Sequence, residues 1–185
     1  MSRSIDLLKK RYLENIKEKP DLFVGIELEY PVINLEGKAT DSEVVKDLFR
    51  YLPSVLGFTI EKVDDFGNPI QLFDPVSQDT ILFEVSYTTI EFAFGRAEFI
   101  QEVEVRFRNY MDLIQKKLSK ANYAIIGSGI HPYWDKNDNQ PVSYARYQML
   151  MNYLKLSRTV LGTDLHDYPE YGAFICGSQV QLDVS

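Results

Sequence analysis

The chain has 185 residues, of which 45% are hydrophobic, enough to bury the core of one domain. Its formal net charge of -7 argues against a nucleic-acid partner, because such binding needs clustered basic side chains to displace phosphate counterions. A single cysteine excludes an internal disulfide and a four-cysteine zinc site.

The chain carries no targeting or membrane-spanning pattern. Residues 1–20 are charged and amphipathic, unlike the apolar core of a signal peptide. No stretch approaches the roughly 18 consecutive apolar residues of a membrane span. We therefore expect a cytoplasmic protein with no membrane partner and no nucleic-acid partner.

The first predicted element is an amphipathic helix over residues 4–18, and an alternating strand follows over residues 22–33. Thr40 and Glu43 have the spacing of a capping box and predict the start of a second helix. Residues 58–94 contain short β-type runs separated by turn residues, a pattern typical of hairpins.

The second half of the chain predicts a helix over about 97–120, a strand over 123–126, a helix over about 144–161 and an alternating strand over 173–184. This order predicts an α+β fold, an antiparallel sheet with helices packed on one face. The chain stops inside the last predicted strand, which would leave an open sheet edge. We therefore expect residues 1–185 to form a single, incomplete domain.

Four glutamates are candidate metal ligands. Glu27 and Glu29 lie two residues apart in a predicted strand, so both project from one face about 7 Å apart. Glu84 and Glu91 lie in strand-like segments that are otherwise poor in charge. If the sheet brings the four carboxylates together, cations must neutralise them, and oxygen ligands suit Mg²⁺. A solvent-facing polar strand is the alternative for the first pair.

Further candidates for a functional site are the imidazole of His131, the guanidinium of Arg146 and the side-chain amide of Gln179. His131 follows the glycine-rich segment 127–129, although a core or capping histidine explains it equally. Arg146 could hold a substrate carboxylate in two parallel hydrogen bonds, with a surface ion pair as the alternative. Gln179 could line a polar pocket or belong to a wet sheet surface.

Five segments in order resemble the glutamate-cysteine ligase family and related carboxylate-amine ligases. They are Phe23–Glu29, the pair Phe83-Glu84 with Ile90–Phe92, Gly129–Pro132, Ala145–Met149 with Tyr153, and Ser178–Asp183. The resemblance implies a fold similar to the catalytic domain of glutamine synthetase, in which the concave face of a curved antiparallel sheet holds metals and substrates. The chain would be the amino-terminal half of such a domain.

This resemblance implies a reaction that depends on ATP and Mg²⁺. The γ-carboxylate of L-glutamate would be joined to L-cysteine through a γ-glutamyl phosphate, the first step of glutathione biosynthesis. Mg²⁺ would stabilise the charge on the transferred phosphoryl group. By motif, the metal ligands would be Glu27, Glu29, Glu84 and Glu91, the first two being catalytic, and the substrate-binding residues would be Arg146, Tyr147, Gln179 and His131.

Members of the family continue beyond the last matching segment, so we expect the chain alone to lack activity. One alternative is a non-catalytic module that binds metal or an amino acid and forms a homodimer through its exposed terminal strand. Another is a related carboxylate-amine ligase with a different amine acceptor.

Overall fold

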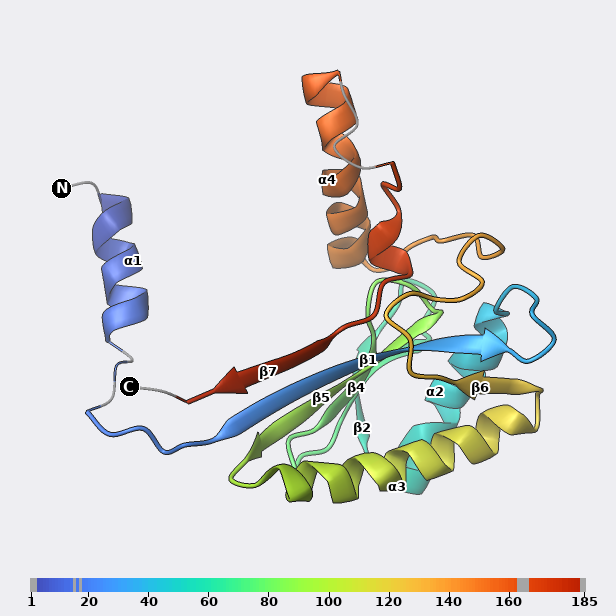
Figure 1. Cartoon of the computed structure of the whole chain (residues 1–185), viewed down its shortest axis with the longest axis horizontal. Coiled ribbons are helices and arrows are strands. Elements are labelled where there is room, and N and C mark those ends of the chain that lie inside the picture. Colours follow the sequence, from blue (N-terminus) through green and yellow to red (C-terminus); the bar gives the residue numbers. More distant parts are fainter. Residues whose placement is uncertain (1–2, 15, 17, 163–166, 184–185) are drawn as a thin grey trace.

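The computed structural model describes residues 3–14, 16, 18–162 and 167–183. It contains an antiparallel sheet of order β2-β3-β4-β5-β1-β6, in which β7 also pairs with β1 (Figure 1). The strands are β1 (Val24–Asn34), β2 (Thr59–Val63), β3 (Pro69–Phe73), β4 (Thr80–Phe83), β5 (Thr89–Ala97), β6 (Tyr123–Ile125) and β7 (Ser178–Leu182). The helices are α1 (Arg3–Leu13), α2 (Ser42–Leu56), α3 (Ile100–Ser119) and α4 (Ala145–Leu161), with a 3-10 turn, η1 (Tyr171–Ala173). The predicted α+β class is confirmed.

Strand β1 is the centre of the sheet. Its first half lies between β5 and β7, and its second half pairs with β6. Because alternate residues of a strand face opposite ways, Glu27 and Glu29 project from one face and Ile26 and Leu28 from the other.

Helices α2 and α3 cover the face that carries Ile26. Phe49 of α2 and Ile114 of α3 are fully buried against the sheet residues Phe83 and Phe92. The rings of Phe49 and Phe83 stack with 3.9 Å between their centroids. Burial of these large apolar side chains is the main source of stability. The opposite face carries the glutamates of β1.

Helix α4 projects away from the sheet and is anchored by its first turns (Figure 1). The buried Tyr147 donates its hydroxyl to the carbonyl oxygen of Phe83 at 2.7 Å. Met151, one turn later, is buried, and Gly172 of η1 lies against it. The beginning of α4 is thereby fixed to the end of β4.

The start of α2 differs from the prediction. Its N-cap is Asp41, whose side chain accepts the backbone N–H of Glu43 at 2.9 Å. The Thr40 hydroxyl donates instead to the carbonyl oxygen of Val32 at 2.7 Å. The predicted capping box is therefore wrong, because Thr40 is drawn into a tertiary contact with β1 and the next residue caps the helix.

Two element boundaries also differ. Helix α1 ends at Leu13, earlier than predicted, and no residue of it is buried. Strand β7 begins at Ser178 and not at residue 173, because residues 171–173 form η1. The alternating pattern over 173–177 thus belongs to a turn and a connecting segment.

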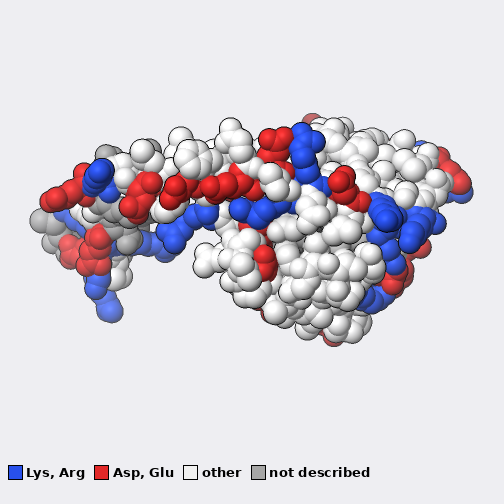
Figure 2. Space-filling model, turned by 90° about the horizontal axis from the view of Figure 1, so that it is seen from below, with Lys and Arg blue, Asp and Glu red and all other residues white. Residues whose placement is uncertain are grey.

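Charges of both signs are interspersed over the face that Figure 2 shows from below. Several pair locally, as in the contacts of Arg108 with Glu104 at 2.7 Å and of Lys117 with Asp47 at 2.8 Å. In the described part of the chain, every helix is too short or too polar to cross a membrane.

Candidate functional site

An acidic cluster lies on the open face of the sheet. One carboxylate oxygen each from Glu29, Glu84 and Glu91 lies within 4.8 Å of the others. The three residues come from β1, from the turn after β4 and from β5, and Glu29 is directly opposite Glu91 in the ladder. The fold thus joins two of the predicted acidic segments that are more than 50 residues apart in the chain.

Glu29 is held by backbone groups of the segment before β7. The N–H of Gly177 donates to Glu29 Oε2 at 2.7 Å, and the N–H of Glu29 donates to the carbonyl oxygen of Gly177 at 2.9 Å. Burial raises the pKa of Glu29, the Gly177 hydrogen bond opposes this, and the charges of Glu84 and Glu27 add to the rise.

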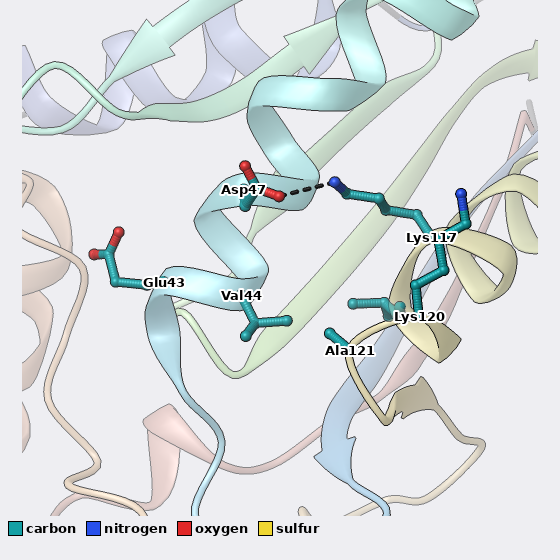
Figure 3. A pocket seen from close by; sticks show the side chains of 7 residues that line it. Glu43, Val44, Asp47, Lys117, Lys120 and Ala121 are labelled. Atoms are coloured by element: carbon teal, nitrogen blue, oxygen red, sulfur yellow. Dashed lines mark hydrogen bonds and ion pairs between the residues drawn. The ribbon is translucent and has the colours of Figure 1, made fainter.

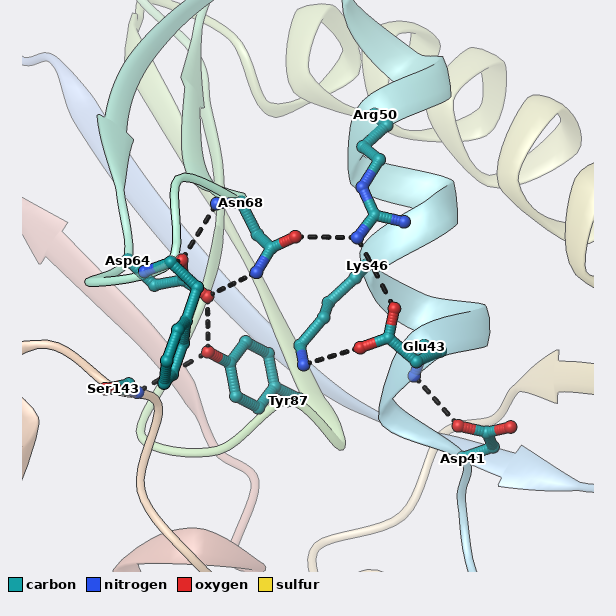
Figure 4. Close-up of polar contacts among 9 residues, drawn as sticks. Asp41, Glu43, Lys46, Arg50, Asp64, Asn68, Tyr87 and Ser143 are labelled. Carbon is teal, nitrogen blue, oxygen red and sulfur yellow. Dashed lines mark hydrogen bonds and ion pairs between the residues drawn. The ribbon is translucent and has the colours of Figure 1, made fainter.

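The turn between β4 and β5 positions Glu84. Within it, Tyr87 donates its hydroxyl to Asp64 Oδ2 at 2.7 Å and accepts the N–H of Ser143 at 3.4 Å (Figure 4). Asp64 lies between β2 and β3, and Ser143 precedes α4. The turn is therefore tied to two other segments of the chain.

The same polar network reaches helix α2. Asn68 donates its side-chain amide to Asp64 at 2.9 Å and accepts from Arg50 at 2.6 Å (Figure 4). Burial and the hydrogen bond to Asp64 raise the pKa of Tyr87. The Tyr87 hydroxyl therefore remains a neutral donor to Asp64 at physiological pH.

Glu91 is the most perturbed carboxyl group of the cluster. Burial, a hydrogen bond with Glu84 and the charges of Glu84, Glu27 and Glu29 raise its pKa from the ordinary 4.5 to about 9. Two carboxylates 4.8 Å apart repel by on the order of 3 kcal/mol at an effective dielectric of 20. Without a cation, Glu91 therefore favours its protonated form at neutral pH.

The donor set fits a hard divalent cation. Oxygen ligands at Mg²⁺ lie about 2.1 Å from the ion, so two of them are at most about 4.2 Å apart. Separations of up to 4.8 Å need only small side-chain adjustments to reach that geometry. Among the described residues, no Lys or Arg forms an ion pair with Glu29, Glu84 or Glu91 that would already neutralise them.

Glu27 shares the face of the cluster but lies outside it. In the ladder it is opposite Ala93 on β5 and Gln179 on β7. Its charge nevertheless raises the pKa of both Glu29 and Glu91. The predicted role of Glu27 as a ligand therefore requires a second cation or a bridging substrate oxygen.

A groove of about 330 Å³ adjoins the cluster. It is lined by Glu29, Tyr30, Gly127, Ser128, Gly129, Cys176, Gly177 and Ser178. Burial and the Glu29 charge raise the pKa of Cys176 to about 12, so its side chain remains a thiol. The sequence singled out neither Cys176 nor Gly177 for this position, because their approach to Glu29 depends on the pairing of β7 with β1.

The structure gives Tyr147 and Arg146 different surroundings. Tyr147 is 8% exposed and its hydroxyl is engaged by Phe83, so it anchors α4 next to Glu84. Arg146 is exposed, and within the described chain it forms no ion pair. A substrate-binding role for Arg146 stays a prediction.

His131 is fully buried and lies directly after the segment 127–130. Its Nε2 lies 2.9 Å from the carbonyl oxygen of Val32 and 3.2 Å from the Thr40 hydroxyl, and its Nδ1 accepts the N–H of Tyr133 at 3.1 Å. Burial lowers the pKa of His131 and favours the neutral ring. Both ring nitrogens are occupied, so the geometry gives His131 a positioning role for the loop that follows residues 127–129.

Gln179 lies on the same face as the cluster. It is exposed on β7, and its side chain hydrogen-bonds Glu29, which lowers the pKa of that carboxyl group. The alternation of β7 therefore directs this amide to the acidic face. Whether it contacts a substrate stays a prediction.

A second hollow of about 350 Å³ lies between the start of α2 and the end of α3 (Figure 3). Val44 lies in it, and Lys117 spans it to Asp47 at 2.8 Å. These helices cover the buried face of the sheet, so the hollow is separate from the acidic cluster. Its charges largely neutralise one another, and we assign it no function.

No protein-family model matches the sequence, and comparison with curated proteins gives no significant match.

Proposed function

We propose that the open face binds Mg²⁺ and the phosphates of ATP and supports ligation of L-glutamate to L-cysteine in the cytoplasm. The observation that carries this proposal is the convergence of Glu29, Glu84 and Glu91 from three elements, with no ion-paired Lys or Arg among the described residues. A half-buried acidic cluster of this kind is costly unless a cation or a proton neutralises part of its charge. The ordered resemblance to glutamate-cysteine ligases supports the choice of substrates.

The chain's own residues would orient the reactants. Glu29, Glu84 and Glu91 would hold the cation, and Gly177 keeps Glu29 in place through its N–H. When bound, Mg²⁺ would supply positive charge that stabilises the transferred phosphoryl group. Arg146 would contact a substrate carboxylate.

The amine must lose a proton as it attacks the γ-glutamyl phosphate. Glu27 is on the face of the cluster but outside it, so it is the carboxylate available to accept that proton. The adjoining groove of about 330 Å³ has the size of a small-molecule site and could receive an amino acid.

Metal binding is the first test. We expect Mg²⁺ to bind the chain by calorimetry, and Glu84→Gln to weaken binding by more than about tenfold, the effect typical even of residues that contact a ligand indirectly. Glu98→Gln, which changes an exposed carboxylate near the start of α3, is the matched control. Equal affinities of the two variants would rule out the cluster as the metal site.

Turnover is the second test. ADP release and γ-glutamylcysteine formation are measured with Mg²⁺, ATP, glutamate and cysteine. Any turnover, which would go against the expectation that the chain alone lacks activity, should be lost in Glu27→Gln while metal binding persists. A different ligated product would identify another amine acceptor. Metal binding without ADP release would contradict ligase activity of this chain and favour a non-catalytic binding module.

A further inference from the structure

Strand β7 has one paired edge and one open edge. It pairs with β1, and no other strand in the described part of the chain pairs with it. All five of its residues are exposed. In Figure 1 β7 forms the margin of the sheet beside the first half of β1.

The hydrogen bonds at the two ends of β7 define which backbone groups point toward β1. The N–H of Asp183 donates to the carbonyl oxygen of Phe23 at 2.9 Å, and the carbonyl oxygen of Gly177 accepts the N–H of Glu29 at 2.9 Å. In an antiparallel ladder, the backbone N–H and carbonyl groups of every second residue point to one neighbouring strand, and those of the residues between them point to the other side.

This alternation divides β7 into two sets. Gln179 and Gln181 direct their backbone groups toward β1, in step with the hydrogen-bonded ends. Ser178, Val180 and Leu182 therefore direct their N–H and carbonyl groups away from the sheet. Such a row of free groups is a template for another strand.

We propose that the open edge of β7 pairs with β7 of a second copy of this chain. The strands are antiparallel and related by a two-fold axis at Val180. In this register Val180 is opposite the partner's Val180 and Ser178 is opposite the partner's Leu182. Every outward backbone group in both strands then meets a complementary group, as an isologous interface requires.

The residues of β7 favour self-pairing over an isolated edge. The segment Ser178–Leu182 contains no charge and no proline, the features that commonly protect an edge. Val180 and Leu182 are 63% and 66% exposed, and the two Val180 side chains would form a cross-strand pair. Asp183 would lie opposite the partner's Gly177, so the acidic ends of the two strands do not meet.

The dimer would also make the acidic faces of the two copies continuous. Gln179 would be opposite the partner's Gln181 on the acidic side, giving one continuous polar surface with a cluster at each end. This inference rests on the edge geometry alone and stands or falls independently of the proposed ligase activity.

Val180→Pro tests the interface selectively. It removes an N–H that points outward and leaves the groups that pair with β1. An outward-facing position on an edge strand is one that proline tolerates. Val180→Lys would place two ammonium groups at the axis. Val76→Lys, at a site 90% exposed between β3 and β4, is the control with the same charge change.

We expect a dimer for the full chain and for Val76→Lys by sedimentation, and a monomer for both Val180 variants with unchanged circular dichroism. A monomeric wild type would overturn the proposal, as would a dimer that survives both Val180 substitutions.

Hydrogen exchange of the wild type gives a test that does not depend on any variant folding. Dilution should accelerate exchange at the amides of Ser178, Val180 and Leu182 and leave Gln179 and Gln181 unchanged. Equal responses of the two sets would contradict this interface.

Discussion

A protonated Glu91 links the acidic cluster to the stability of the fold. Its pKa is about 9 in the folded chain and near 4.5 in an unfolded one, so folding takes up a proton between these values. The stabilising contribution of the neutral form is fully present below pH 4.5 and is lost as the pH rises through about 9. At higher pH, where Glu91 loses its proton, a bound cation would neutralise the charge of the cluster instead.

Glu91→Gln should therefore remove the part of the pH dependence of the free energy of unfolding that Glu91 causes. A glutamine keeps a neutral side chain of the same shape, so the metal-free variant should gain stability over wild type as the pH rises from 4.5 toward 9. The measurement is the free energy of unfolding in urea with a chelator present, at several pH values.

His131 contributes a pH dependence of stability that is opposite in sign to that of Glu91. It cancels when wild type is compared with Glu91→Gln. Its pKa is lowered in the fold, so its contribution is present above its ordinary pKa of 6.5 and is lost as the pH falls through that value. Because both chains contain His131, their difference reports Glu91. Glu98→Gln should follow wild type; a similar gain in that control would contradict the assignment.

At the scale of elements, the sequence predicts the strand of Glu27 and Glu29 because its side chains alternate between a buried and an open face. Only the motif resemblance places Glu84 with Glu29. Periodicity cannot, because Glu84 lies beyond the last residue of β4 and its position depends on the sheet register and on the Tyr87 network. The exclusion of Glu27 from the cluster has the same origin. These features arise from tertiary pairing, not from local periodicity.

A buried carboxylate fixes α3 to the sheet. Asp79 is 1% exposed; it accepts the N–H of Gly95 and the hydroxyl of Tyr110, each at 2.8 Å, and lies 2.8 Å from Arg106 Nε. Gly95 is obligatory here, since a Cβ would lie 2.0 Å from the carbonyl oxygen of Ser77. The contact therefore joins β5, α3 and the turn before β4.

Tyr110→Phe should destabilise the fold by about 1.5–3 kcal/mol, because it removes a hydrogen bond to a buried charge. Urea unfolding measures the loss. Tyr12→Phe, on the exposed surface of α1, should change stability by less than about 0.5 kcal/mol. Equal effects of the two substitutions would show that Asp79 does not depend on the tyrosine.

At the scale of the whole molecule, α1 should be dispensable for folding. None of its residues is buried, and the body is closed by α2 and α3 without it. Deleting residues 1–20 should therefore leave the thermal midpoint and the near-ultraviolet circular dichroism unchanged. A marked fall in the midpoint would mean that the apolar stripe of α1 packs against the body in solution.

The two faces of the sheet divide stability from function, so a ligand on the open face should stabilise the whole molecule without altering its core. A fixed Mg²⁺ concentration, set at a hundredfold excess over the dissociation constant at pH 9, should add about 2.7 kcal/mol to the free energy of unfolding at that pH. Because the cation competes with the proton on Glu91, the shift should be larger near pH 9 than at neutral pH, and Glu91→Gln should lose this dependence. Thermal unfolding with and without Mg²⁺ at both pH values measures it. An equal shift in wild type at both pH values would mean that the cation binds away from the cluster.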